Sequence, residues 1–279
     1  MSCRRRRAWW PEARAQNGAV VTAGSLIEGA LRRDRVLVVG CLLFVMALSW
    51  AYLLTGAGMM QEMGDMLMPM SSGPWTPGHA LIVLAMWAVM MAAMMLPSAA
   101  PMILLHATLA RRQAERGAPA AASGAVAAGY LATWAAFSLA ATTLQYALEQ
   151  AALLSPMMQT SSRVLAAAVL IAAGLYQWTP LKQACLRHCR SPLDFVMTHW
   201  RPGARGAFVM GLRHGTVCVG CCWLLMLLLF VGGVMNLAWI AGIALFVLVE
   251  KLSPAGHWIG RGAGALLLIW GAATLFAAT

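Results

Sequence analysis

The chain has 279 residues, of which 61% are hydrophobic and only 10% are charged, and its formal net charge is +11. A soluble domain carries about a quarter charged residues, so this composition excludes an ordinary soluble globular protein. Several apolar runs approach or exceed the roughly 20 residues that cross a bilayer as a helix. We therefore predict an all-α, polytopic transmembrane helix bundle.

Seven hydrophobic segments account for the predicted bundle, and six spans is the alternative because the sixth and seventh segments are short. Their approximate limits are Val36–Thr55, His79–His106, Gly124–Leu148, Val164–Thr179, Ala207–Val231, Val234–Val249 and Gly262–Ala278. We expect residues 34–279 to form a single transmembrane domain. Residues 1–33 are expected to form a disordered, basic cytoplasmic tail.

The basic residues indicate how the chain is oriented. In the seven-span arrangement all but two of the 20 lie on one side of the membrane, the exceptions being Arg163 and Arg213. The positive-inside rule then places the N-terminus in the cytoplasm and the C-terminus outside. The charge follows membrane edges and is not interleaved with aromatic residues, so we expect no nucleic-acid partner.

The predicted first outer loop is rich in methionine. Six of the 20 methionines lie between Met59 and Met70, and Met60, Met63 and Met66 are the candidate metal ligands among them. Thioether sulfur binds Cu(I) and does not form disulfides, which suits an oxidising compartment. The alternative is an apolar interfacial segment in which methionine only packs.

A second group of methionines follows the face of the predicted second span. Met86, Met90 and Met94 are four residues apart, and Met91 and Met95 form an adjacent stripe. The Met90/Met94 pair is locally similar to the Met-x-x-x-Met pair in a membrane helix of Ctr-type copper transporters. Core or lipid packing is the competing interpretation. Pro97 and Pro101 are expected to bend the inner half of this helix.

The predicted fifth span carries the sharpest pattern in the sequence. His214, Cys218, Cys221 and Cys222 fall within an arc of about 100° on a helix, which predicts a metal or redox site near mid-membrane. The alternative is three small thiols that pack against neighbouring helices, with His214 as a hydrogen-bond donor. Arg213, a charge inside a span, predicts that this face lines a polar interior.

The loop after the fourth span repeats the pattern. Cys185, His188 and Cys189 converge on a helical turn as three candidate ligands. The fourth ligand would come from one of three other histidines, which are His199, His106 and His257. At the end of the sixth span, Glu250 and Lys251 predict an ion pair at the membrane interface.

Five segments resemble a bacterial family described as predicted metal-binding integral membrane proteins (domain of unknown function 2182). They are Ala93–Met102, Cys185–Pro192, Cys218–Met226, Gly233–Trp239 and Val249–Lys251, and the resemblance runs from about Met86 to Ala272. It implies metal binding, a helical membrane fold and a multi-pass location in the bacterial inner membrane. It implies no particular reaction.

These patterns favour a protein that binds, transfers or transports Cu(I), with zinc as the alternative metal. No P-loop, GxSxG or HExxH motif is present, so we expect binding rather than catalysis. The expected partners are the lipid bilayer, the metal ion, and a metallochaperone or partner membrane protein. Two other functions remain open, a membrane thiol oxidoreductase that acts with a quinone and an assembly or scaffold factor.

Overall fold

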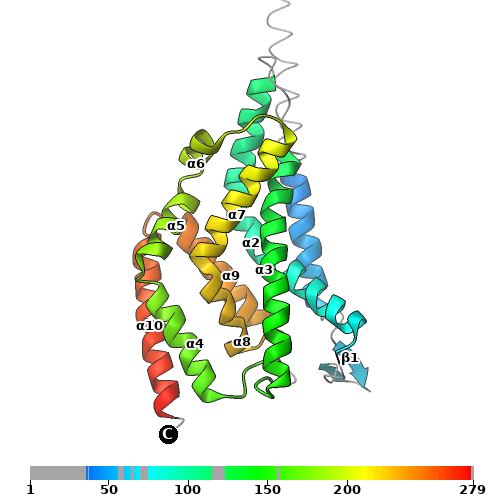
Figure 1. The fold of residues 1–279 in the computed structure, drawn as a ribbon, viewed down its shortest axis with the longest axis vertical. Coiled ribbons are helices and arrows are strands. Elements are labelled where there is room, and N and C mark those ends of the chain that lie inside the picture. The colour runs from blue at the N-terminus through cyan, green and yellow to red at the C-terminus, as the bar shows by residue number, and fades with distance from the viewer. Residues whose placement is uncertain are drawn as a thin grey trace, which may run out of the picture.

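A computed structural model describes residues 36, 38–55, 60–63, 66–69, 75–114, 123–155 and 158–277. It is a bundle of helices that run roughly along one long axis (Figure 1). After a helix over Val38–Leu54, the elements are β1 (Met60–Met63), β2 (Met66–Pro69), α2 (Pro77–Ala114), α3 (Ser123–Gln150), α4 (Arg163–Tyr176), α5 (Pro180–Arg190), α6 (Pro192–His199), α7 (Gly203–Leu227), α8 (Leu229–Gly232), α9 (Leu237–Leu252) and α10 (Gly256–Phe276).

Each of the seven predicted spans contains a helix. Within the described ranges, four segments are long and apolar enough to cross a membrane, and a bent pair of helices would make a fifth. The four are Pro77–Gln113, Gly124–Gln150, Gly203–Gly232 and Gly256–Phe276. The first helix and α9 are shorter, with α9 only 16 residues long. The membrane-helix class is thereby supported, whereas the count of seven stays a prediction.

The predicted fourth span ends at a sharp bend in the structure. Helix α4 ends at Tyr176 instead of Thr179, and the axis turns by 64° before α5 begins at Pro180. Proline disfavours a helical backbone in the residue before it, and Thr179 is extended with ψ 144°. The Thr179 hydroxyl then caps α5 by accepting from the backbone N–H of Lys182. Local chemistry therefore fixes the bend.

The methionine-rich loop departs from the all-α prediction. Its backbone forms a two-stranded antiparallel hairpin in which Met63 is paired with Met66 and Met60 with Pro69. Strand pairing satisfies the backbone hydrogen bonds of a short segment that is not helical. Everything else regular in the described chain is helical.

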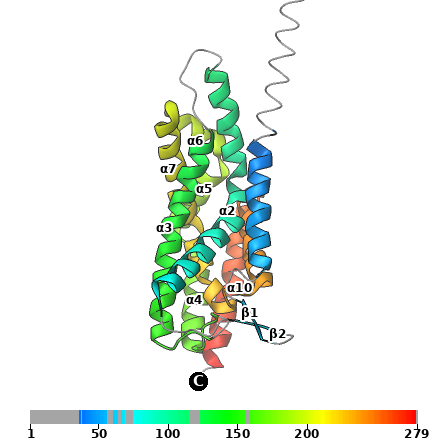
Figure 2. The same cartoon turned by 90° about the vertical axis from the view of Figure 1, so that its right-hand side faces the viewer.

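Two packing units build the bundle. Helix α3 lies against α7 with α2 behind them, and α4 lies beside α10 at the opposite side (Figure 1). Helix α2 changes direction along its length (Figure 2), and it contains Pro97 and Pro101 as a bent helix would. Its inner face is buried, and α2, α3 and α7 thus enclose the centre of the molecule.

Candidate functional site

One buried face of α7 carries the predicted stripe. Exposure is 4% for His214 and at most 1% for Cys218, Cys221 and Cys222. The thiols of Cys221 and Cys222 both donate to the backbone carbonyl of Cys218, over 3.1 and 2.9 Å. A thiol can donate to the carbonyl one turn back in its own helix. These bonds hold the Cys221 and Cys222 thiols next to the turn that begins at Cys218.

The Cys218 sulfur has two polar neighbours from other helices. Lys251 of α9 donates from Nζ over 2.9 Å, and the Tyr130 hydroxyl of α3 lies at 3.1 Å. Lys251 also donates to the Ser98 hydroxyl of α2 over 3.2 Å. A buried ammonium requires a compensating negative or strongly polar partner, and it stabilises negative charge on the sulfur beside it. Three helices therefore meet at the Cys218 sulfur, and α2 joins them through the contact of Ser98 with Lys251.

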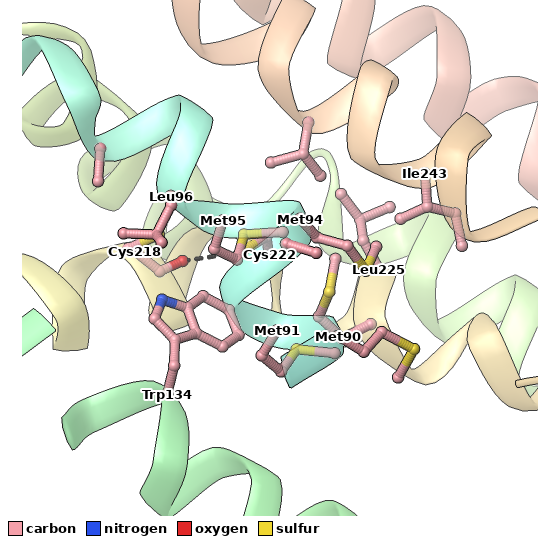
Figure 3. Packing of buried hydrophobic residues seen from close by; sticks show 14 of the residues in the cluster. Met90, Met91, Met94, Met95, Leu96, Trp134, Cys218, Cys222, Leu225 and Ile243 are labelled. Carbon is pink, nitrogen blue, oxygen red and sulfur yellow. Dashed lines mark hydrogen bonds between the residues drawn. The ribbon is translucent and has the colours of Figure 1, made fainter. Parts of the chain in front are cut away.

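Further sulfur atoms surround this turn. Met95 Sδ of α2 lies 4.0 Å from Cys222 Sγ, and Cys189 Sγ of α5 lies 4.0 Å from Cys221 Sγ. Cys185 packs against Gly220, where an added Cβ would lie 2.9 Å from its sulfur. We call Met95, Cys189, Cys218, Cys221 and Cys222 the sulfur cluster. Three helices contribute to it, and Figure 3 shows Met95, Cys218 and Cys222 facing one another across α2 and α7.

The other predicted methionines lie beside the cluster or outside the described side chains. Met90 and Met94 are fully buried on α2 and pack with Met91 in the core (Figure 3). The structure gives Met95, which the sequence did not single out as a ligand, the contact with a thiol. The side chains of Met60, Met63 and Met66 lie outside the described part of the structure.

His188 stays apart from the sulfur cluster. Its side chain is exposed, and Nδ1 lies 2.8 Å from the Ala184 carbonyl oxygen of its own helix. Cys189 faces inward to α7 instead, so the convergence of Cys185, His188 and Cys189 does not occur. Residues one position apart on a helix point about 100° apart, and tertiary packing selects which of them faces inward.

Two buried histidines have nitrogen atoms without a hydrogen-bond partner among the described residues. They are Nδ1 of His214 and both nitrogens of His106. His106 is fully buried on α2 and stacks on Trp200, with ring centroids 5.1 Å apart. Buried polar groups are normally hydrogen-bonded. These imidazole nitrogens are therefore available to a ligand.

The charged pair at the end of α9 differs from the prediction. Glu250 pairs with Lys182 of α5 at 2.8 Å, and both side chains are at most 1% exposed. Gln177 also accepts from Lys182. Lys251 points the other way to Cys218, because neighbouring residues diverge around a helix. The pair Glu250–Lys251 is therefore absent, and two separate buried interactions replace it.

Arg213 does not line the interior. Its side chain is exposed, while His214, the next residue, is buried. Arg213 was therefore the wrong indicator, although the stripe face of α7 does meet buried polar groups, which come from Tyr130 and Lys251. Charged residues of other helices could not be assigned to this site without knowing how the helices pack.

No group of three or more His, Cys, Asp or Glu side chains in the described ranges is arranged to hold a metal ion. Two of the α7 thiols hydrogen-bond to a carbonyl, and an ammonium occupies the position of a cation beside Cys218. The donors nevertheless suit a soft ion, because thiolate and thioether sulfur both select Cu(I). The sulfur atoms that lie near one another form pairs, either of two cysteines or of a cysteine and a methionine.

Comparison with known families gives a match over residues 84–274 to PpoB2, a family described as copper chaperone. The matched range starts within α2 and contains the whole sulfur cluster. It almost coincides with the extent of the resemblance drawn from the sequence motifs. No curated protein and no solved structure matches the chain.

Proposed function

We propose that this chain, which belongs to the PpoB2 copper chaperone family because the match covers more than half of its residues, holds Cu(I) as cargo on the sulfur cluster. The observation that carries the proposal is the contact of the Cys218 sulfur with the Lys251 ammonium at 2.9 Å in a fully buried position. The protein thereby keeps a positive charge against a sulfur atom inside an apolar core.

Charge balance favours two thiolates as the ligands. Cu(I) bound by Cys218 and either Cys221 or Cys222 would form a complex with one net negative charge. The Lys251 ammonium would neutralise that charge, which removes most of the penalty for burying it. Both ligands bind as thiolates, so each thiol that is protonated in the empty site releases its proton when Cu(I) binds.

Methionines provide the neutral part of the path. Met95 is in contact with Cys222, and Met90 and Met94 continue the buried surface of α2 away from the cluster (Figure 3). A neutral thioether holds Cu(I) without adding negative charge, whereas a thiolate adds one. We therefore propose that the methionines of α2 pass Cu(I) to the thiols of α7.

Elemental analysis of the purified protein tests the proposal. Protein purified anaerobically with Cu(I) present is expected to retain copper in a stoichiometric amount. The Cys218/Cys221/Cys222→Ser variant is expected to lose it, because hydroxyl oxygen is a poor ligand for a soft ion. The matched control is Cys41→Ser, since Cys41 is an exposed thiol on the first helix.

Two results would overturn this function. One is wild-type protein that remains free of copper after copper-supplemented anaerobic purification. The other is a copper content in the triple variant equal to that of Cys41→Ser. Zinc retained in place of copper would keep the site and change its cargo.

One distance favours a second candidate function. Cys189 and Cys221 come from different helices, and their sulfur atoms lie 4.0 Å apart. Oxidation of the two thiols to a disulfide by a membrane quinone would yield a quinol and transfer two electrons and two protons. Alkylation followed by mass measurement would detect it, because the oxidised protein would carry two fewer alkyl groups than the reduced protein. Equal labelling with and without quinone would exclude this function.

A further inference from the structure

A pocket of about 380 Å³ lies between α5 and the start of α10, on a different side of α5 from the thiols. Its lining contains three guanidinium groups and an imidazole, together with uncharged side chains. The lining residues are Pro180, Gln183, Leu186, Arg187, Arg190, His257 and Arg261. We call it the basic pocket.

The basic pocket carries an excess of positive charge. In the part of the chain that the structure describes, no salt bridge joins Arg187, Arg190 or Arg261 to a carboxylate, and the nearby carboxylate of Glu250 is paired with Lys182. Three guanidinium groups around one cavity repel one another unless an anion lies between them. The Glu250 carboxylate, already paired with Lys182, offsets only part of the charge of Arg190. Arginine is also the side chain best suited to phosphate, which it binds with two parallel hydrogen bonds.

The backbone holds the pocket in shape. Arg190 donates to the carbonyl oxygens of Ser253 and Pro254 over 2.6 and 2.7 Å, which ties α5 to the turn before α10. The pocket also borders the first turn of α10, where the helix dipole favours negative charge. The cavity therefore combines fixed arginines with a helix end that favours negative charge.

Apolar side chains flank the basic pocket on the outer surface. Leu181, next to Pro180, is 61% exposed, and Trp258, next to His257, is 64% exposed. Arg261 lies over the Trp258 ring at 5.6 Å. Farther along α10, Leu266 and Ile269 are exposed as well. Tryptophan beside arginine, with an apolar helix face beyond, is typical of the membrane interface and of the surface that acyl chains cover.

We propose that the basic pocket binds the phosphate group of an anionic phospholipid, with the acyl chains along the apolar face of α10. The three guanidinium groups recognise the phosphate, and the exposed apolar side chains distinguish a lipid from free phosphate. Basic pockets between membrane helices on the cytoplasmic side bind anionic head groups in this way. A bound lipid would join α5, which carries Cys185 and Cys189, to α10.

Native mass spectrometry of the full chain, delipidated in detergent, tests the proposal. Phosphatidylglycerol is expected to bind about tenfold more tightly than phosphatidylcholine at equal concentration. The Arg187→Gln/Arg261→Gln variant is expected to lose this preference. The control is Arg112→Gln/Arg205→Gln, which removes the same charge from two exposed arginines outside the pocket. Copper content is measured in parallel, so the lipid result is independent of the proposed cargo.

Each outcome has a definite meaning. Preference for phosphatidylglycerol that is lost in the pocket variant and kept in the control supports the proposal. Equal binding of the two lipids, or a preference that both variants keep, overturns it. If millimolar inorganic phosphate displaces the bound lipid in the mass spectrum, the pocket is a site for free phosphate, and the lipid proposal is overturned. If the glutamine variant does not fold, Arg187→Lys/Arg261→Lys replaces it, and it is expected to weaken the preference because lysine binds phosphate as a point charge.

Discussion

Lys251 is the residue that most changes the interpretation of this chain. The sequence places it next to Glu250, where an ion pair at the membrane interface is the simplest expectation. In the structure the two side chains diverge, and Lys251 reaches Cys218 of α7 while Glu250 reaches Lys182 of α5. Successive residues of a helix point about 100° apart, so the two adjacent charged side chains reach different helices.

The first prediction concerns the charge of Lys251. Lys251→Met keeps the apolar stem but removes the ammonium that would neutralise a bis-thiolate Cu(I) complex. We expect the affinity for Cu(I) to fall about tenfold or more, since loss of one buried charge contact is worth about 1.4 kcal/mol or more. Competition with a colorimetric Cu(I) chelator measures the affinity.

Lys251→Arg is the matched control, because it keeps the positive charge and changes only the shape of the head group. It is expected to retain most of the affinity. Unchanged affinity in Lys251→Met would show that the ammonium has no part in holding the cargo. Higher affinity would mean that Lys251 competes with copper for Cys218.

The close approach of α3 and α7 is the main feature at the scale of elements. At Gly211 an added Cβ would overlap with the backbone carbonyl of Val126 and lie 3.0 Å from the Tyr130 nitrogen. At Gly129 it would overlap with the carbonyl of Phe208. Glycine at both positions lets the helix backbones touch, as small residues do in membrane bundles. This approach places the Tyr130 hydroxyl beside Cys218.

The second prediction follows from that contact. Gly211→Ala is expected to destabilise the protein by about 2 kcal/mol or more, because the clash is with a backbone and cannot be relieved by a rotamer change. A thermal melt in detergent, followed by tryptophan fluorescence, measures the change. Copper binding should also weaken, since α3 carries Tyr130.

Gly124→Ala is the comparison variant for this experiment. Gly124 lies on α3 as well, but an added Cβ there has no atom within 4 Å. Its melting temperature is expected to equal or slightly exceed that of the wild type, because alanine favours a helix. Equal melting temperatures for Gly211→Ala and wild type would contradict the packing of α3 against α7.

At the scale of the whole molecule, the main feature is the number of membrane spans. By length and composition, four helices or five spans in the described ranges meet the requirement for crossing a membrane. The first helix and α9 are short, and the α4–α5 pair is bent by 64°. Seven spans would place the two termini on opposite sides of the membrane, whereas six would place them on the same side.

The third prediction is that the C-terminus lies outside the cytoplasm. Alkaline phosphatase fused after the last residue is expected to be active, because that enzyme folds only on the oxidising side. A fluorescent protein that folds only in the cytoplasm is expected to stay dark at the same position. An inactive phosphatase fusion together with a bright fluorescent fusion would favour six spans or the opposite orientation.

The sequence alone determined the class of the protein and the inward face of α7. Low charge and long apolar runs require helices in a bilayer, and the spacing of Cys218, Cys221 and Cys222 puts their sulfurs on one face whatever the neighbours are. Both features depend on the helix period and on composition, which are local. The end of the fourth span before Pro180 was local as well, because proline disfavours a helical backbone in the residue before it.

Only the tertiary structure decided which side chains meet that face. Lys251, Tyr130, Met95 and Cys189 come from four other helices, and no spacing in the sequence connects them to Cys218 or its neighbours. Packing also leaves His188 and Arg213 exposed, although each is next to a predicted ligand in the sequence. The physical reason is that helix period fixes directions within one helix, whereas contacts between helices depend on their packing, set here by glycines such as Gly211.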